Sequence, residues 1–294
     1  MGKDCVIMSS WVPSGDRIQP YIDVLVKYYS DCDIYVGVNP SSFADEWIKT
    51  LIDTGLSIKC KITEESMVIK QHASAVQTAL QLYKESNTEY DLVHYIHTKG
   101  ISYANQIVEN PAFIDYYLGY AKKIESIREF MDTNPKYGGW ADFGMLQTQW
   151  FKGKFYDKNA PATNEWMAQS VENATEEIHE YWDWSRYYPF KYKPLRTQWL
   201  TGFYTIRHEL MKEFIDNCSD DFLYGNVEKM GFDIYFFETQ IAQVVCRQGY
   251  LRYTDTLWNH HEHGDDTGGK SKEKEYMDLW VSENNLNITR EDYA

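Results

Sequence analysis

Polar side chains follow directly on one of the most apolar segments of the chain. Residues 90–100 have the sequence YDLVHYIHTKG, so His97, Thr98 and Lys99 come at the exit of an apolar run. A histidine donates a hydrogen bond or ligates a metal, and a lysine neutralises an anion as a point charge. The cluster therefore suits an anionic ligand, and a solvated strand end is the alternative interpretation. His94, which alternates with these residues, is interpreted as a structural histidine.

The first hundred residues alternate between strand and helix patterns, and this order places the cluster. Apolar runs predict four strands, at residues 4–11, 32–39, 56–63 and 90–97. Helical spacing predicts three intervening helices, at residues 17–30, 41–55 and 64–87. Three successive strand-helix-strand units predict a layered α/β fold with a mostly parallel central sheet flanked by helices. Ligands bind such sheets at the carboxyl ends of the strands, where His97 and Lys99 are expected.

The second of these helices carries signals at both ends. Ser41 and Ser42 are candidate N-caps, because a serine hydroxyl can accept a hydrogen bond from the first helical turn. Gly55 is the candidate C-cap, since glycine adopts the left-handed conformation that ends many helices.

No phosphate-binding glycine loop follows the first strand. The segment MSSWVPSGDR has neither the Gly-x-Gly-x-x-Gly spacing of dinucleotide sites nor the lysine of a P-loop. The sequence therefore disfavours a dinucleotide oxidoreductase and a P-loop nucleotidase, and other residues must hold the ligand.

The second half of the chain has a less regular pattern. Residues 101–135 predict one amphipathic helix, and residues 136–151 predict a strand. Residues 170–194 combine a polar helix with an aromatic loop, which suits either a lid over the acceptor or an ordinary peripheral helix. Residues 197–217 predict a short strand that carries Gly202 and leads straight into a helix.

Two further polar groups lie in the last quarter of the chain. Glu238 is placed near the start of a helix predicted within residues 231–250. Residues 260–263 have the sequence HHEH, and imidazole and carboxylate groups are suitable metal ligands. Adjacent residues rarely converge on one ion, so a solvent-exposed turn is the alternative interpretation. The candidate metal ligands are His97, His261 and His263.

The charge of the chain bounds the classes of partner. Its 294 residues carry 29 basic and 44 acidic side chains, which gives a formal net charge of −15. Such a balance disfavours binding to a nucleic-acid backbone or an anionic membrane. No apolar run is long enough for an integral membrane segment. The N-terminal run CVIMSSW is too short for a secretory signal and is better used as a strand, so we expect a cytoplasmic protein.

The five cysteines agree with that compartment. They are widely separated and form no Cys-x-x-Cys pair. We expect reduced thiols rather than a disulfide framework or a zinc site.

Three short blocks resemble a known family. The segment YDLVHYIHTKG resembles the YD-hydrophobic-IHTK segment of rhamnan-synthesis protein F-like glycosyltransferases, found in bacterial polysaccharide clusters and in some large viruses. WLTGFYTIRHELMKEFI is similar to that family's Gly-aromatic strand followed by an R-x-x-L helix, and FFETQIAQVVCRQG resembles the acidic helix start after it. The resemblance spans roughly residues 4–250 in order of elements.

The resemblance implies a GT-A-like fold and a sugar transfer. The enzyme would move a hexosyl or deoxyhexosyl group from a nucleotide-diphosphate donor to a glycan acceptor. It implies one domain over residues 1–294, with a nucleotide-binding half (1–100), an acceptor-side half (101–265) and a C-terminal tail or helix (266–294). The donor-binding residues that it implies are Ser9, Ser10, Trp11, Asn39, His97, Thr98, Lys99 and Gly202.

The same resemblance implies the chemistry. Glu238 would act as general base on the acceptor hydroxyl, with Asp233 as its nearest rival, and direct displacement would invert the anomeric centre. A carboxylate that only favours the helix dipole is the alternative for Glu238. Trp11 would stack on the nucleotide base; the alternative is that its side chain only covers the hydrophobic core.

The chain departs from the usual GT-A pattern at the metal site. Most members carry Asp-x-Asp after the fourth strand, whereas this chain has His97, Thr98 and Lys99 there. Dependence on Mn²⁺ or Mg²⁺ is therefore an open question at the level of sequence. The missing motif also keeps a non-catalytic carbohydrate- or nucleotide-binding protein as an alternative. A sugar nucleotidyltransferase is disfavoured, because no Gly-rich basic loop follows the first strand.

Overall fold

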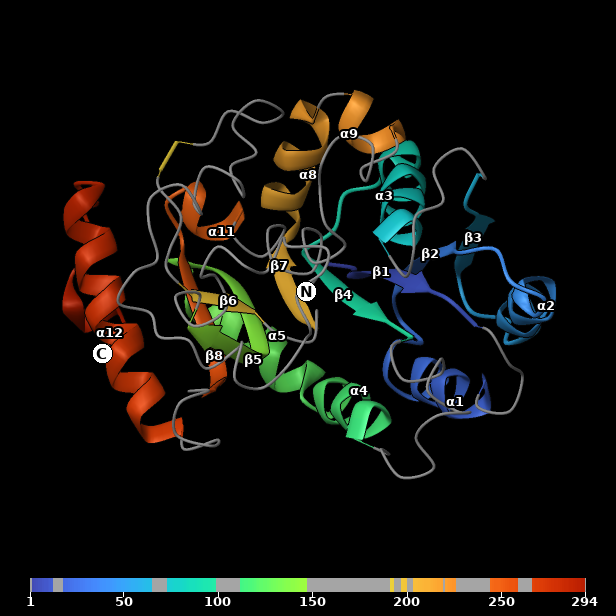
Figure 1. The fold of residues 1–294 in the computed structure, drawn as a ribbon, viewed down its shortest axis with the longest axis horizontal. Helices are drawn as coiled ribbons and strands as arrows, with labels where there is room; N and C mark the ends of the chain where they lie inside the picture. Colours follow the sequence, from blue (N-terminus) through green and yellow to red (C-terminus); the bar gives the residue numbers. More distant parts are fainter. Residues whose placement is uncertain are drawn as a thin grey trace, which may run out of the picture.

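A computed structural model describes most of the first half of the chain and several segments of the second half. The described residues are 2–12, 18–64, 73–98, 112–146, 191–192, 197–199, 203–218, 220–225, 244–258 and 266–293. Figure 1 shows these elements arranged around one continuous sheet.

The first half follows the predicted alternation of strands and helices. Its strands are β1 (Cys5–Ser10), β2 (Asp33–Val38), β3 (Ile58–Ile62) and β4 (Leu92–His97). Its helices are α1 (Ile18–Tyr28), α2 (Ala44–Asp53) and α3 (Ala73–Ser86). The order strand, helix, strand is confirmed throughout, and each element lies within its predicted range.

The second half completes the sheet and adds helices. Its strands are β5 (Tyr137–Leu146), β6 (Thr197–Trp199), β7 (Tyr204–Arg207) and β8 (Leu251–Trp258). Its helices are α4 (Ala112–Lys122), α5 (Ile124–Thr133), α8 (His208–Asn217), α9 (Asp220–Tyr224), α11 (Val244–Arg247) and α12 (Asp266–Glu283), and η7 (Arg290–Asp292) is a short 3₁₀ turn.

The sheet is mixed but mostly parallel. The strand order is β3-β2-β1-β4-β7-β5-β6, and β8 pairs with β5. The pairs β3–β2, β2–β1, β1–β4 and β5–β8 are parallel, whereas β7 runs antiparallel between β4 and β5. The predicted layered α/β fold with a mostly parallel central sheet flanked by helices is therefore confirmed.

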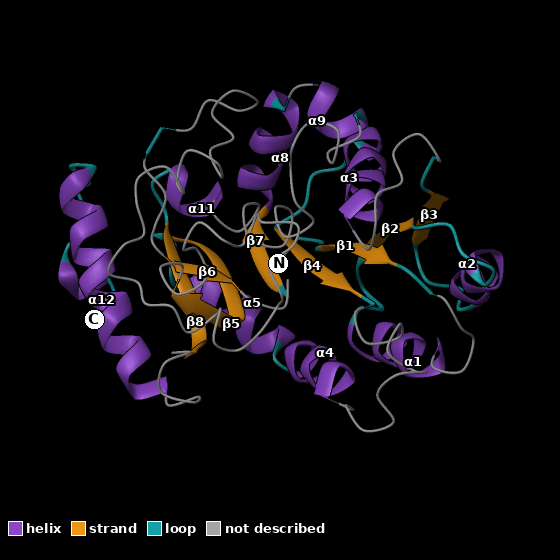
Figure 2. Ribbon diagram, viewed as in Figure 1, coloured by secondary structure: helices purple, strands orange, loops and turns teal. Residues whose placement is uncertain are grey.

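Helices lie on both faces of the sheet (Figure 2), and alternate residues of its strands pack into two cores, one on each face. Cys5 and Ile7 of β1 pack toward α3 and α8, whereas Val6 and Met8 pack toward α1, α2 and α4. All four side chains are fully buried, because helices cover both faces of a parallel sheet. This is why β1 is a continuous apolar run rather than an alternating one.

Close packing of α3 on β2 depends on a glycine. A Cβ atom built on Gly37 would lie 1.8 Å from the carbonyl oxygen of Ala75 in the first turn of α3. Only a residue without a side chain lets the two backbones approach so closely. The contact fixes the start of α3 above the carboxyl half of β2.

Four sequence predictions need correction. The helix predicted over residues 101–135 is two helices, α4 and α5, interrupted at Lys123. Ser41 does not cap α2: Phe43 is the N-cap residue, and the Ser41 hydroxyl donates to the carbonyl of Val12 at 2.6 Å. Strand β8 was not predicted at all. Thr54, rather than Gly55, is the C-cap residue of α2; Gly55 follows it with a φ of +74°, the left-handed conformation that ends many helices.

No helix among the described residues is both long and apolar enough to cross a bilayer.

Candidate active site

The segments that follow β1, β2 and β4 meet at one edge of the sheet. Ser9 pairs with His97 across β1 and β4, and Ser10 pairs with Val38 across β1 and β2. The hydrogen-bond ladder continues one residue beyond the strands, because the backbone N–H of Thr98 donates to the Ser9 carbonyl at 3.1 Å. Parallel register thus brings residues that are far apart in sequence to the same edge.

Thr98 and Trp11 are joined by two hydrogen bonds at this edge. The backbone N–H of Trp11 donates to Thr98 Oγ1 at 3.0 Å, and the Thr98 hydroxyl donates to the Trp11 carbonyl at 3.3 Å. Thr98 is fully buried, whereas Trp11 is half-buried. The threonine therefore holds the exit of β1 in place, and the tryptophan is the part of the pair that solvent reaches.

Ser9 and Ser10 are fully buried, and their hydroxyls bond within the protein. Ser10 Oγ donates to the Gly37 carbonyl at 3.0 Å and accepts from the indole N–H of Trp47 at 3.1 Å. Ser9 Oγ lies 3.1 Å from the hydroxyl of Tyr95. These hydroxyls fix β1 against its two neighbouring strands.

Asn39 ties the end of β2 to the first turn of α3. Its backbone N–H donates to the Ser10 carbonyl at 2.8 Å, and its Oδ1 accepts from the hydroxyl of Ser74 at 2.7 Å. Both side chains are buried. Asn39 thus joins the same edge, as its position after β2 predicts.

The His97 ring packs into the protein at the end of β4. It is 1% exposed and stacks on the ring of Phe203, with 4.6 Å between centroids and 27° between planes. Phe203 directly precedes β7, the strand that pairs with the other side of β4. Sequence reasoning did not single out Phe203, although the Gly-aromatic pattern before that strand was the available signal.

Other predicted site residues lie outside the described residues. These are Lys99, Gly202, Asp233, Glu238, His261 and His263. Among the residues that are described, no group of three or more His, Cys, Asp or Glu side chains is arranged to hold a metal.

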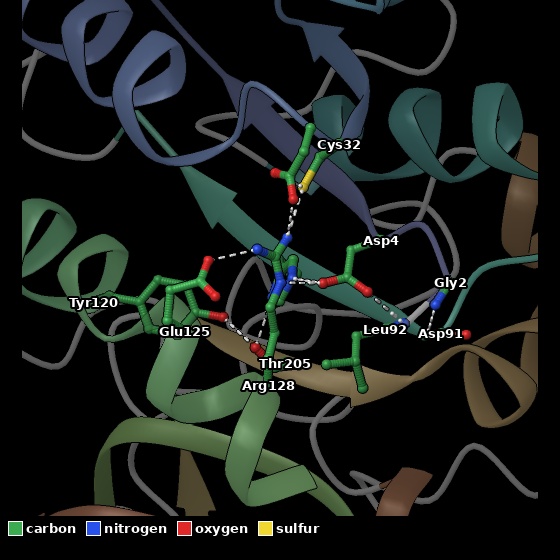
Figure 3. A network of polar contacts seen from close by, with 11 residues as sticks. Gly2, Asp4, Cys32, Asp91, Leu92, Tyr120, Glu125, Arg128 and Thr205 are labelled. Atoms are coloured by element: carbon green, nitrogen blue, oxygen red, sulfur yellow. Dashed lines mark hydrogen bonds and ion pairs between the residues drawn. The ribbon is translucent and has the colours of Figure 1, made fainter. Parts of the chain in front are cut away.

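A buried polar network links the strands β4 and β7 and the start of β1 to the helices α4 and α5 (Figure 3). His94 is fully buried; its Nδ1 lies 2.8 Å from Thr205 Oγ1 and its Nε2 lies 3.2 Å from Asp4 Oδ2. Thr205 also bonds to the hydroxyl of Tyr120 at 2.6 Å. Both ring nitrogens are therefore engaged inside the protein, which agrees with the structural interpretation of His94.

Asp4 and Arg128 anchor one end of that network, and neither was noticed in the sequence. Arg128 Nε donates to Asp4 Oδ2 at 2.7 Å, and its other nitrogens pair with Asp31 at 3.0 Å and Glu125 at 2.7 Å. Burial acts to raise the pKa of Asp4, but the hydrogen bonds and charges of His94 and Arg128 outweigh it and lower that pKa. Asp4 is therefore a charged group held at the amino end of β1.

Two further carboxylates, one on β5 and one on β8, pair with the same lysine. Ala141 and Thr254 are paired across these strands, so the next residues, Asp142 and Asp255, lie side by side. Both carboxylates pair with Lys123, between α4 and α5, and the Asp255 contact is 2.6 Å. Burial acts to lower the pKa of Lys123, but the two aspartates outweigh it and raise that pKa. The missed strand β8 hid this cluster from sequence reasoning.

Comparisons with known proteins add little beyond this geometry. No protein-family model matches the chain, and no curated protein is similar enough in sequence to match. Among solved structures, glucosyl-3-phosphoglycerate synthase from Mycobacterium tuberculosis, crystallised with Mg²⁺ and uridine diphosphate, is 13% identical with a TM-score of 0.34. The match covers 98% of this chain and 81% of that one. A likeness of this size identifies neither a family nor an activity.

Proposed function

We propose that the protein is a nucleotide-sugar-dependent glycosyltransferase with a GT-A-like fold. It would transfer a hexosyl or deoxyhexosyl group from a nucleotide-diphosphate donor to a glycan acceptor. The observation that carries the proposal is the meeting of the segments after β1, β2 and β4, which the Thr98–Trp11 and Asn39–Ser10 hydrogen bonds hold together. Open α/β sheets bind ligands at this edge. The resemblance of three sequence blocks to rhamnan-synthesis protein F-like transferases supplies the ligand class.

In this proposal the donor lies across the described edge. The half-buried indole of Trp11 offers a face for the nucleotide base, since aromatic stacking recognises any base. Ser9, Ser10, Asn39 and Thr98 set the backbone of the surrounding turns through their internal hydrogen bonds. Lys99, which follows Thr98 directly, would supply positive charge to the diphosphate.

The proposed reaction is a direct displacement at the anomeric carbon. An acceptor hydroxyl attacks that carbon and loses its proton to the Glu238 carboxylate, while the bond to the diphosphate oxygen breaks and the nucleoside diphosphate leaves. Asp233 is the rival base. Gly202 would let a sugar approach the backbone closely, because it has no side chain.

The proposal includes a divalent metal, but no complete set of ligands for it is assigned. Mn²⁺ or Mg²⁺ would neutralise the diphosphate, and His97, His261 and His263 were the candidate ligands. Of these three the structure describes His97, whose ring already stacks on Phe203, so metal binding there has to compete with that contact.

Donor binding is the first test. We expect one of UDP-, GDP- or dTDP-sugar to raise the melting temperature, because a ligand that binds the native state stabilises it by mass action. Each donor is measured with and without manganese, which decides whether a metal takes part. Trp11→Ala should abolish the shift, whereas Tyr224→Ala, which truncates an exposed aromatic residue on α9, should retain it. No shift with any donor contradicts the proposal.

Turnover separates an enzyme from a binding protein. With the selected donor, Glu238→Gln should lower kcat by about 100-fold or more while donor affinity stays unchanged. Asp233→Asn is the matched control, because it makes the same change at the rival carboxylate. Full turnover by Glu238→Gln would reject Glu238 as base. Nucleotide binding without transfer or hydrolysis by the wild-type protein would favour the non-catalytic alternative.

A further inference from the structure

A shallow pocket lies at the opposite edge of the sheet from the candidate active site. It is formed by the end of α3 and by one face of α8, and it is open to solvent. Leu92, which begins β4, pairs with Arg207, which ends β7, so both flanking helices reach the sheet at its other edge. The pocket is therefore separate from the edge assigned to the donor.

A buried imidazole of this pocket already contacts a carboxylate that solvent reaches. His208 is 4% exposed; its Nδ1 lies 2.7 Å from the hydroxyl of Tyr83, and its Nε2 lies 3.1 Å from Glu89 Oε2. A carboxylate only accepts hydrogen bonds, so Nε2 carries the hydrogen. The Glu89 side chain is 78% exposed and can swing away from this donor.

Two ammonium groups line the same pocket. Lys212 lies four residues after His208 on α8, so both side chains share a helix face. Lys212 pairs with Asp216. The side chain of Lys84, in the last turn of α3, is half-buried and makes no hydrogen bond or ion pair with the other residues that the structure describes. Its charge is thus available to a ligand.

The start of α8 adds partial positive charge to a pocket that the Asp216 carboxylate also lines. The helix begins at His208, and its N-cap residue, Arg207, makes no side-chain cap hydrogen bond. Partial positive charge at a helix N-terminus favours anions, and it acts here together with the imidazole N–H and the two ammonium groups.

We propose that this pocket binds a phosphate group, as inorganic phosphate or as the phosphate of a small phosphorylated metabolite. His208 Nε2–H and the ammonium groups of Lys84 and Lys212 would donate to its oxygens, and the ligand would displace the Glu89 carboxylate. Because the pocket is open, the remainder of a larger phosphorylated ligand would extend into solvent. The site is independent of the proposed sugar transfer.

Charge substitutions of opposite sign test the proposal, with inorganic phosphate as the probe. Affinity is measured by calorimetry at constant ionic strength, with chloride as the reference anion. Lys84→Gln should weaken phosphate binding about tenfold or more, and Glu89→Gln should strengthen it, because each changes one charge beside the anion. Lys49→Gln on α2 removes an equal charge far from the pocket and should leave affinity unchanged.

Further measurements exclude indirect effects. The melting temperature of each variant in chloride shows whether it is folded. Saturating UDP, GDP or dTDP, each added separately, should leave phosphate affinity unchanged, which distinguishes this pocket from the donor edge. Equal phosphate affinity in wild type, Lys84→Gln and the double variant with Lys212→Gln would overturn the proposal. Absence of measurable heat at millimolar phosphate would overturn it as well, whatever the outcome of the donor screen.

Discussion

His94 and Asp4 show how a residue type can suggest chemistry and serve structure. The sequence does not distinguish a histidine at a strand end from one in the middle of a strand. In the structure the mid-strand histidine, His94, has two buried hydrogen-bond partners. The carboxylate of Asp4 accepts from His94, from Arg128 and from the backbone N–H of Leu92. These bonds tie β1, β4 and α5 together at the amino end of the sheet.

The lowered pKa of Asp4 predicts a loss of stability in acid. Its folded pKa lies below its unfolded value of about 3.9, so its contribution is present above that value and is lost as pH falls through the folded pKa. Asp4→Asn should cost about 1–3 kcal/mol near neutral pH, because Arg128 loses its buried partner but keeps Asp31 and Glu125. The difference from wild type should shrink below about pH 4.

Urea unfolding across a pH series measures this. Asp53→Asn, at an exposed position near the end of α2, is the control and should change the free energy of unfolding little. A cost of Asp4→Asn that does not vary with pH would contradict the assigned ion pair.

The place of the donor-edge residues could be predicted, but their partners could not. Parallel register follows from the strand-helix alternation, so Ser10, Asn39 and Thr98 could be assigned to one edge from the sequence. The indole of Trp47 that bonds to Ser10, and the ring of Phe203 that covers His97, come from elements whose docking depends on tertiary packing. No spacing rule in the sequence connects them.

At the scale of elements, glycines on helices and strands behave differently. Gly37 has no room for a side chain because the backbone of α3 lies against it, and backbone cannot move aside as a side chain can. Gly119 lies within α4, and a Cβ atom there would meet no atom within 4 Å. The same substitution should therefore have opposite effects at the two positions.

Gly37→Ala should destabilise the protein by about 3 kcal/mol or more, because α3 has to shift away from β2. Gly119→Ala should be neutral or stabilise it by up to about 1 kcal/mol, since alanine is the better helix former. Free energies of unfolding from urea titrations decide between these outcomes. Equal effects at both glycines would mean that α3 does not approach β2 as described.

The elements that the sequence mispredicted are those without a local signal. The break between α4 and α5 falls at Lys123, which is neither glycine nor proline, and the ion pairs of Lys123 with Asp142 and Asp255 accompany it. Strand β8 has polar or charged side chains at Arg252, Thr254, Asp255 and Thr256, which interrupt its apolar pattern. In both places tertiary contacts, rather than propensity, decide the local structure.

At the scale of the whole molecule, the excess of acidic over basic side chains affects stability. The net charge of −15 means that acidic side chains outnumber basic ones. Repulsion among the excess negative charges should destabilise the folded state at low ionic strength. Salt also weakens exposed pairs such as Lys61–Glu64, but each such pair contributes only about 0–1 kcal/mol. We expect repulsion to be the larger effect.

Raising ionic strength from about 0.01 to 0.15 M shortens the screening length from about 30 to 8 Å and should raise the melting temperature by a few degrees. Sodium and potassium chloride should give equal shifts, because screening does not depend on the identity of the cation. A melting temperature that falls with salt would show that the attractive pairs dominate.

Strand β7 has a consequence for the newly made chain. It occupies one side of β4, but it is translated about a hundred residues later. At about 5–20 residues per second, on the order of ten seconds pass before the ribosome delivers it. Throughout this interval the nascent β4 presents unpaired backbone groups along an apolar edge, which is the kind of surface that pairs with other chains. We therefore expect synthesis of this protein to depend on chaperones that shield that edge.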